Sequence, residues 1–270
     1  MDNVTVDSGN QYKKRVNKII DEMTLFDDDL MTLVFDKNIS ATELILRIIL
    51  GRRIRVISVK AQEELRSPLV GGRDITLDIH AVDEDGEDID VEVQSSSDGA
   101  HVRRARFHSA VLDSRNLRER EEFKKLRDSY VIFIYKHDKF GKGLPIYRVE
   151  RVVFETGEAF DDGSHIVYVN GKYKGDDEIG KLIQDFYSTS PDDMNYKELS
   201  DSVRHFKKTE KGRDVMSELL QKYADECVER STVENVKNLM KNMNMTLEQA
   251  LDAMGISGKE RSNIMEKLSK

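Results

Sequence analysis

The sequence predicts an α/β core followed by an all-helical appendage. Three observations support this fold class. Strand patterns alternate with helical ones in the first two thirds of the chain, Asp- and Gly-rich turns separate neighbouring strands, and the remainder shows only helical spacing. The 270 residues suffice for one good-sized domain plus an appendage. We therefore expect two domains, residues 1–190 and 191–270.

Two helices and a strand are expected at the start of the chain. Residues 11–35 carry apolar side chains at near-helical spacing. A second helix is predicted to begin at Ser40, which stands three residues before Glu43 in a capping pattern, and to stop at Gly51. The segment 54–62 is β-branched and alternates in polarity, which predicts a strand.

The later elements include a buried strand, because SYVIFIY is continuously apolar and fits the centre of a sheet. The other patterns indicate a hairpin, a helix dense in arginine, two further strands and a helical tail. The expected elements are strands at 75–82, 88–94, 129–135, 147–155 and 165–171, a helix over 100–127, and helices from 176 to 268.

Composition excludes several classes of protein. The net charge of −8 argues against a generic nucleic-acid coat protein, although the distribution of charge matters more than its sum. The single Cys227 excludes a disulfide framework within the chain and a cysteine-based zinc site, and it fits a reducing compartment. The most apolar run, LILRIIL, is too short to span a bilayer, and no signal peptide is evident. We expect a soluble, cytoplasmic protein without a membrane partner.

The stretch LDIHAVDEDGEDIDVEVQ predicts a hairpin in a specific register. With a three-residue loop that ends at Gly86, Ile79 faces Val91 on an apolar face, and Asp78 faces Glu92 on a polar one. A two-residue turn would shift the register by one and mix the two faces. The register therefore places two carboxylates side by side, with Cβ atoms about 5 Å apart.

Two carboxylates so close repel each other unless a cation or a proton separates them. Mg²⁺ suits such a pair, because it binds one or two carboxylates and completes its shell with water and phosphate oxygens. A half-exposed hairpin whose polar face meets water is the plainer interpretation of the hairpin alone.

The charge around the hairpin favours the metal. Residues 74–98 contain ten acidic side chains and no Lys or Arg, whereas residues 101–127 contain nine basic side chains and four acidic ones. Metal-assisted cleavage of a phosphodiester needs this combination, since a metal activates water while arginines hold the polyanion. A solvated helix face with i,i+4 ion pairs is the alternative for the basic segment.

These residues resemble a known family. The hairpin is similar to the core motif of the PD-(D/E)XK nuclease superfamily, in which an Asp on one strand faces Glu-x-Lys on the next. The Glu-x-Gln variant, followed by RARFH at 104–108, more closely resembles the recombination-promoting nuclease, or transposase-like, family; VIFIYKHDKFGKGLPIYRVE resembles its central strand and following hairpin. The resemblance covers roughly residues 20–190 and implies a restriction-endonuclease-like mixed sheet flanked by helices.

The resemblance also implies a site. Asp78 and Glu92 would bind Mg²⁺, with Mn²⁺ as a substitute, and the backbone carbonyl of Val93 would add a ligand. Gln94 replaces the motif lysine and would position the attacking water. Asp28 or Asp29, in a segment that has diverged from the N-terminal block of the family, is a further candidate.

Contacts with DNA are expected from Arg103, Arg104 and Arg106. His80 and His108 are candidates for water or phosphate contacts, but we leave both outside the catalytic set, since a lone histidine is more often structural.

The tail offers a second candidate surface. Residues 245–268 have the outline of a helix-turn-helix, with Lys259 and Arg261 near the start of the second helix, where they would face a major groove. Packing or dimerisation is the plainer interpretation, and a homodimer through the C-terminal helices is a related expectation.

Two functions follow from the sequence. The first is a Mg²⁺-dependent DNA endonuclease that hydrolyses phosphodiesters, in recombination or mobile-element biology. The second is a non-catalytic DNA-binding or interaction protein that retains the fold, favoured by the neutral amide of Gln94 and the acidic net charge.

Overall fold

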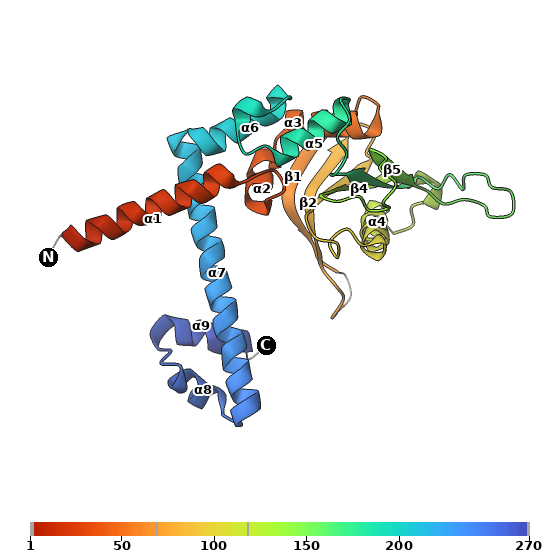
Figure 1. Ribbon diagram of the computed structural model, residues 1–270. Coiled ribbons are helices and arrows are strands. Elements are labelled where there is room, and N and C mark those ends of the chain that lie inside the picture. The colour runs from red at the N-terminus through yellow and green to blue at the C-terminus, as the bar shows by residue number, and fades with distance from the viewer. Residues whose placement is uncertain (1–2, 68–69, 118, 269–270) are drawn as a thin grey trace. The chain divides into compact units, whose positions relative to one another are not determined.

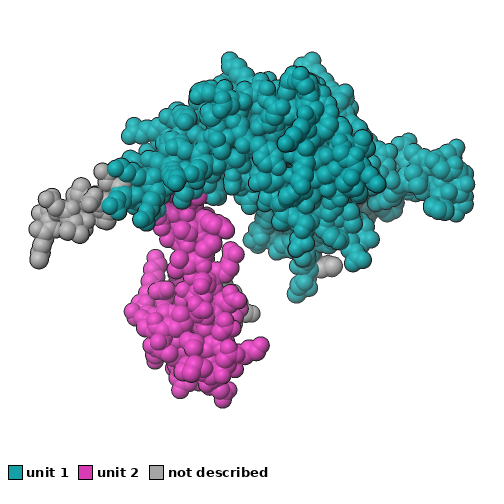
Figure 2. All heavy atoms as spheres, in the orientation of Figure 1, with its two compact units in different colours: residues 1–216 teal, residues 217–270 magenta. Residues whose placement is uncertain are grey.

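The computed structural model describes residues 3–67, 70–117 and 119–268, and gives side-chain environments from residue 11 onward (Figure 1). The chain divides into two compact units, residues 1–216 and 217–270, coloured teal and magenta in Figure 2. The sequence-based domain boundary at residue 190 stays a prediction.

The first unit is built on a mixed six-stranded sheet with the order β1-β2-β3-β4-β6-β5. The pairs β1–β2, β2–β3 and β5–β6 are antiparallel, whereas β3–β4 and β4–β6 are parallel. The strands are β1 (Val56–Leu65), β2 (Ile75–Asp83), β3 (Asp88–Gln94), β4 (Ser129–Tyr135), β5 (Ile146–Val149) and β6 (Ser164–Asn170). This sheet, its flanking helices and the helical C-terminal region confirm the predicted fold class.

Strand β4 is the central strand that its sequence predicts. All seven of its residues are buried, because β3 and β6 pair with it on either side. The hairpin register is also confirmed: Ile79 pairs with Val91 and His80 pairs with Asp90. Gly86 has a left-handed backbone with φ of 79°, as the three-residue loop requires.

Helices pack against the sheet at different strands. Helices α2 and α3 contact β1, and α4 contacts β4. The helices of this unit are α1 (Asn3–Glu22), α2 (Asp28–Phe35), α3 (Ile39–Leu50), α4 (Val102–Asn116), α5 (Glu178–Tyr187) and α6 (Lys197–Lys208), with 3-10 turns at Phe123–Lys125 and Pro191–Asp193.

Two expectations for the first helices are wrong. The single helix expected over 11–35 is broken, because the Asp27 carboxylate accepts bonds from the backbone and the hydroxyl of Thr24 and closes a turn between α1 and α2. The next helix is capped by Asn38, whose side chain accepts from the Ala41 N–H, and not by Ser40. Its expected end is confirmed, since Gly51 caps α3 with φ of 71°.

Two later elements are shorter than expected. The helix predicted over 100–127 ends at Asn116, because Leu112 is its last buried apolar residue and the charged continuation has nothing to bury. The strand predicted over 147–155 ends at Val149; beyond it, Val152 makes only an isolated bridge to Ala159.

The second unit has its own small core. Helix α7 (Glu210–Met243) continues into it, and α8 (Leu247–Ala253) and α9 (Gly258–Leu268) complete it. Thr246 and Gln249 form a capping box at the start of α8. The buried side chains of this core are Val236, Ala250, Leu251, Ile256 and Ile264. In the described part of the chain, no helix combines the length and hydropathy needed to cross a lipid bilayer.

Lys207 on α6 is a fully buried cation in the first unit. Its ammonium donates to the backbone carbonyls of Asp21 at 3.1 Å and Thr189 at 2.7 Å, and also to that of Met23. Three carbonyl acceptors match the three donors of an ammonium group. Lys207 therefore ties α6 to the end of α1 and to the segment after α5.

We predict that Lys207→Met lowers the free energy of unfolding by about 2–4 kcal/mol, because it leaves three carbonyls without their donor. Urea unfolding would measure the loss. Lys208→Met is the matched control, since the neighbouring lysine is exposed. Equal stability of the two variants would contradict a structural role for Lys207.

Candidate metal centre and active site

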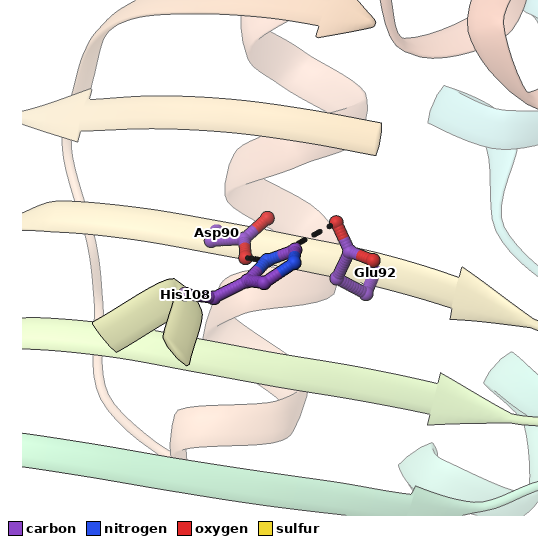
Figure 3. A group of neighbouring side chains, drawn as sticks. All are labelled: Asp90, Glu92 and His108. Atoms are coloured by element: carbon purple, nitrogen blue, oxygen red, sulfur yellow. Dashed lines mark hydrogen bonds and ion pairs between the residues drawn. The ribbon is translucent and has the colours of Figure 1, made fainter. Parts of the chain in front are cut away.

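Strand β3 carries two carboxylates into the interior of the protein. Asp90 and Glu92 are both 0 % exposed, and Asp78 on β2 is 9 % exposed. The alternative of a solvated polar face is therefore wrong for these residues. Figure 3 shows that the side chains of Asp90 and Glu92 lie on one side of β3 and that His108 of α4 points toward them.

Helix α4 supplies two partners from successive turns. Arg104 donates to Glu92 Oε2 at 2.5 Å, and His108 Nδ1 lies 2.8 Å from Asp90 Oδ2 and 3.7 Å from Glu92 Oε1. Because Arg104 Nε donates to His108 Nε2 at 3.3 Å, the proton of the neutral imidazole belongs on Nδ1, where it is donated to Asp90. Burial, and then the charge of Arg104, help to hold the pKa of His108 below its usual value.

The three residues predicted to be catalytic do come together. The ladder between β2 and β3 runs only as far as Ile79–Val91, and beyond it carboxylates bridge the two strands. Asp78 Oδ2 accepts from Val93 N at 2.9 Å, and the Asp78 N–H donates to Glu92 Oε1 at 3.3 Å. The Gln94 amide donates to Asp78 at 3.2 Å and to Glu92 at 3.3 Å. The metal-ligand role predicted for the Val93 carbonyl stays a prediction.

Gln62 on β1 also holds Asp78, a contact that sequence reasoning missed. Its amide donates to Asp78 Oδ1 at 3.2 Å. Its backbone has φ of 52° in the middle of a strand, a left-handed conformation that costs a non-glycine residue on the order of 1 kcal/mol or more. Such strain persists where surrounding contacts impose it, and here it accompanies the hydrogen bond to the carboxylate.

Asp90 and Glu92 keep protons at neutral pH. Burial, reinforced by the charge of Asp78, raises the pKa of Asp90 to about 8. Burial, followed by the charges of Asp90 and Asp78, raises the pKa of Glu92 to about 9. The pKa of Asp78 is also raised, chiefly by burial and in part by the charge of Asp28 at the start of α2. A cation would replace these protons favourably.

A metal fits one group of these residues. Asp90, Glu92 and His108 each offer a ligand atom, and the three atoms lie within 4.8 Å of one another. Asp90 Oδ1 is buried and has no hydrogen-bond partner within the described residues, so this oxygen could serve as a ligand once its carboxyl group loses its proton. Carboxylates with an imidazole suit several divalent metals, so this group does not fix the ion.

The sequence alone left Asp90 and His108 out of the metal site. Asp90 stands two residues before Glu92 and so shares its strand face, and His108 follows Arg104 by one helical turn. Those two spacings were the available signals. Neither is distinctive, because alternation and i,i+4 pairs are common.

An open cleft of about 1030 Å³ leads to the site. Asp78 and Gln94 line it, together with Arg103, Arg104 and Arg106, the three arginines predicted to contact DNA. Lys259 and Arg261 belong to the second unit, where Arg261 forms an ion pair with Asp252 at 2.5 Å.

Comparison with models of known protein families identifies the family of the chain. A family described as PD-(D/E)XK nuclease family transposase matches residues 37–174, more than half of the 270 residues. The chain belongs to this family. The matched residues include β1 to β4, β6 and α4, which carry every side chain of the site described above except Asp28. A search of curated proteins and a search of solved structures find no match.

The raised pKa values of Asp90 and Glu92 predict that the metal-free protein loses stability as pH rises. Between about pH 5 and pH 8 the folded state keeps two protons that the unfolded state has released, so the free energy of unfolding should fall by about 2–3 kcal/mol per pH unit, and by about half as much between pH 8 and pH 9. Urea unfolding in EDTA would measure this slope. Glu92→Gln should reduce this slope to about half below pH 8, because Asp90 still contributes; an unchanged slope in that variant would contradict the assignment.

A substitution at Gly99 should displace the side chain of Gln94 without changing Gln94 itself. A Cβ at residue 99 would lie 1.9 Å from Gln94 Oε1, so Gly99→Ala should push this flexible amide away from Asp78 and Glu92. The side-chain amide resonances of Gln94 should shift in NMR spectra, while the fold stays intact. Ser97→Ala, at an exposed neighbouring position, is the control, and resonances unchanged by Gly99→Ala would contradict the prediction.

Proposed function

We propose that the protein is a metal-dependent endonuclease that hydrolyses phosphodiester bonds in DNA, in recombination or mobile-element biology. The observation that carries the proposal is the convergence of Asp78, Glu92 and Gln94 from two strands beside a cleft lined with arginines. Membership of a nuclease family implies DNA as the partner.

The chain's own residues take distinct roles in this proposal. Asp78 and Glu92 hold the cation, and Asp90 and His108 complete its surroundings. When bound, a divalent metal such as Mg²⁺ or Mn²⁺ activates water and offsets charge on the phosphate. Gln94 orients the attacking water through hydrogen bonds, since a neutral amide cannot take up a proton.

Arg104 changes partner in this scheme. In the structure its guanidinium donates a hydrogen bond to Glu92 Oε2 at 2.5 Å. A cation held by Glu92 would replace this contact, and the guanidinium, which already lines the cleft, would then be free to contact a phosphate together with Arg103 and Arg106. The same three arginines then hold the DNA backbone.

A non-catalytic DNA-binding protein is the second candidate function. It is favoured by the replacement of the motif lysine by Gln94, which removes a cation from the site. The DNA contacts from Lys259 and Arg261, and a homodimer through the C-terminal helices, remain predictions under either function.

Nicking of supercoiled plasmid by the purified protein tests the proposal. We expect cleavage with Mg²⁺ or Mn²⁺ and none in EDTA. Asp78→Asn and Glu92→Gln should each reduce the rate at least about 100-fold, because loss of a ligand exceeds the usual effect of losing an outer-shell partner. Asp85→Asn, in the exposed loop of the same hairpin, should cleave like wild type.

The outcome separates the two functions. Metal-dependent nicking that both site variants abolish would support the endonuclease. No nicking by a protein that still binds DNA would favour the binding function, and nicking that survives in both variants would place the active site elsewhere.

A further inference from the structure

The face of α4 that borders the cleft combines cations with an exposed aromatic ring. Phe107 is 40 % exposed and lines the cleft together with Arg103 and Arg106. Both arginines are exposed and, within the described residues, neither forms an ion pair with a carboxylate. An exposed aromatic ring that shares a cleft with these two unpaired arginines is not explained by packing.

We propose that Phe107 is a stacking platform for an unpaired nucleobase, so that the site takes single-stranded or locally unpaired DNA. This inference rests on the proposed function, whose substrate class it narrows. Aromatic rings combined with a positively charged groove are the usual means of holding single strands, because every base has a face that can stack. Arg103 and Arg106, which line the same cleft, supply the phosphate contacts.

An intact duplex does not fit this arrangement. The faces of its bases are stacked on each other, and only the base edges are exposed in the grooves. The carboxylates are also buried, with Asp90 and Glu92 both 0 % exposed, so the scissile phosphate must enter the cleft to approach them. A single strand can follow a concave path more closely than a duplex can.

The position of the ring limits which base it holds. Phe107 directly precedes His108, whose Nδ1 lies 2.8 Å from Asp90 Oδ2, and both residues line the cleft. The stacked base therefore belongs to a nucleotide adjacent to the phosphate that is cut. Negatively supercoiled plasmid offers such unpaired segments transiently.

Equilibrium binding in EDTA tests the inference without requiring cleavage. Fluorescence anisotropy would compare a labelled single-stranded oligonucleotide with the corresponding duplex. Wild type should prefer the single strand at least about tenfold, and Phe107→Ala should lose most of that preference. Phe107→Tyr should retain it. Val102→Ala is the matched control, because Val102 is 49 % exposed on the same helix but does not line the cleft.

The results separate this inference from the proposed endonuclease. Preferential binding that depends on the ring supports the subsite, whether or not the plasmid is nicked. Duplex binding as tight as single-strand binding, or a Phe107→Ala variant that binds the single strand as wild type does, overturns the inference. In that case plasmid nicking would still stand as a separate result.

Discussion

Two carboxylates buried on a single strand set the conditions for the rest of the site. Taking a charge out of water costs several kcal/mol, so Asp90 and Glu92 cannot remain ionised without compensation. Arg104 and His108 arrive from α4 to provide part of it, and bound protons provide the remainder. The burial of Asp90 and Glu92 on β3 therefore depends on the position of α4, which brings Arg104 and His108 to them.

The same buried carboxyl groups lower the stability of the metal-free protein and provide the ligands for a metal. Without metal, the first unit keeps carboxyl groups that would be more stable in water, and it tolerates them because their protons remain bound. A bound cation would displace these protons, and the same groups would then stabilise the fold as its ligands. Gln94 adds no charge to this buried group, because its neutral amide contacts both Asp78 and Glu92.

The sequence predicted the part of the site whose geometry depends on the turn and on the alternation of side chains along a strand. A loop closed by Gly86 and the two-residue period of a strand determine the register, and the register brings Asp78 beside Glu92. The sequence did not predict the part of the site that depends on contacts between elements distant in the chain. A lone histidine has no spacing signature, so His108 joins the site only because α4 lies on β3. The left-handed backbone of Gln62 likewise results from tertiary contacts.

The conformation of Gln62 also affects how the sheet meets other chains. Strand β1 lies at the edge of the sheet, where a flat row of free amide and carbonyl groups would invite a foreign strand. Here Asp36 and Glu43 already accept from the N–H groups of Ala61 and Val56, and the positive φ of Gln62 departs from the extended backbone of a regular edge strand. Part of the edge that a foreign strand would use is therefore already occupied by carboxylates of the protein itself.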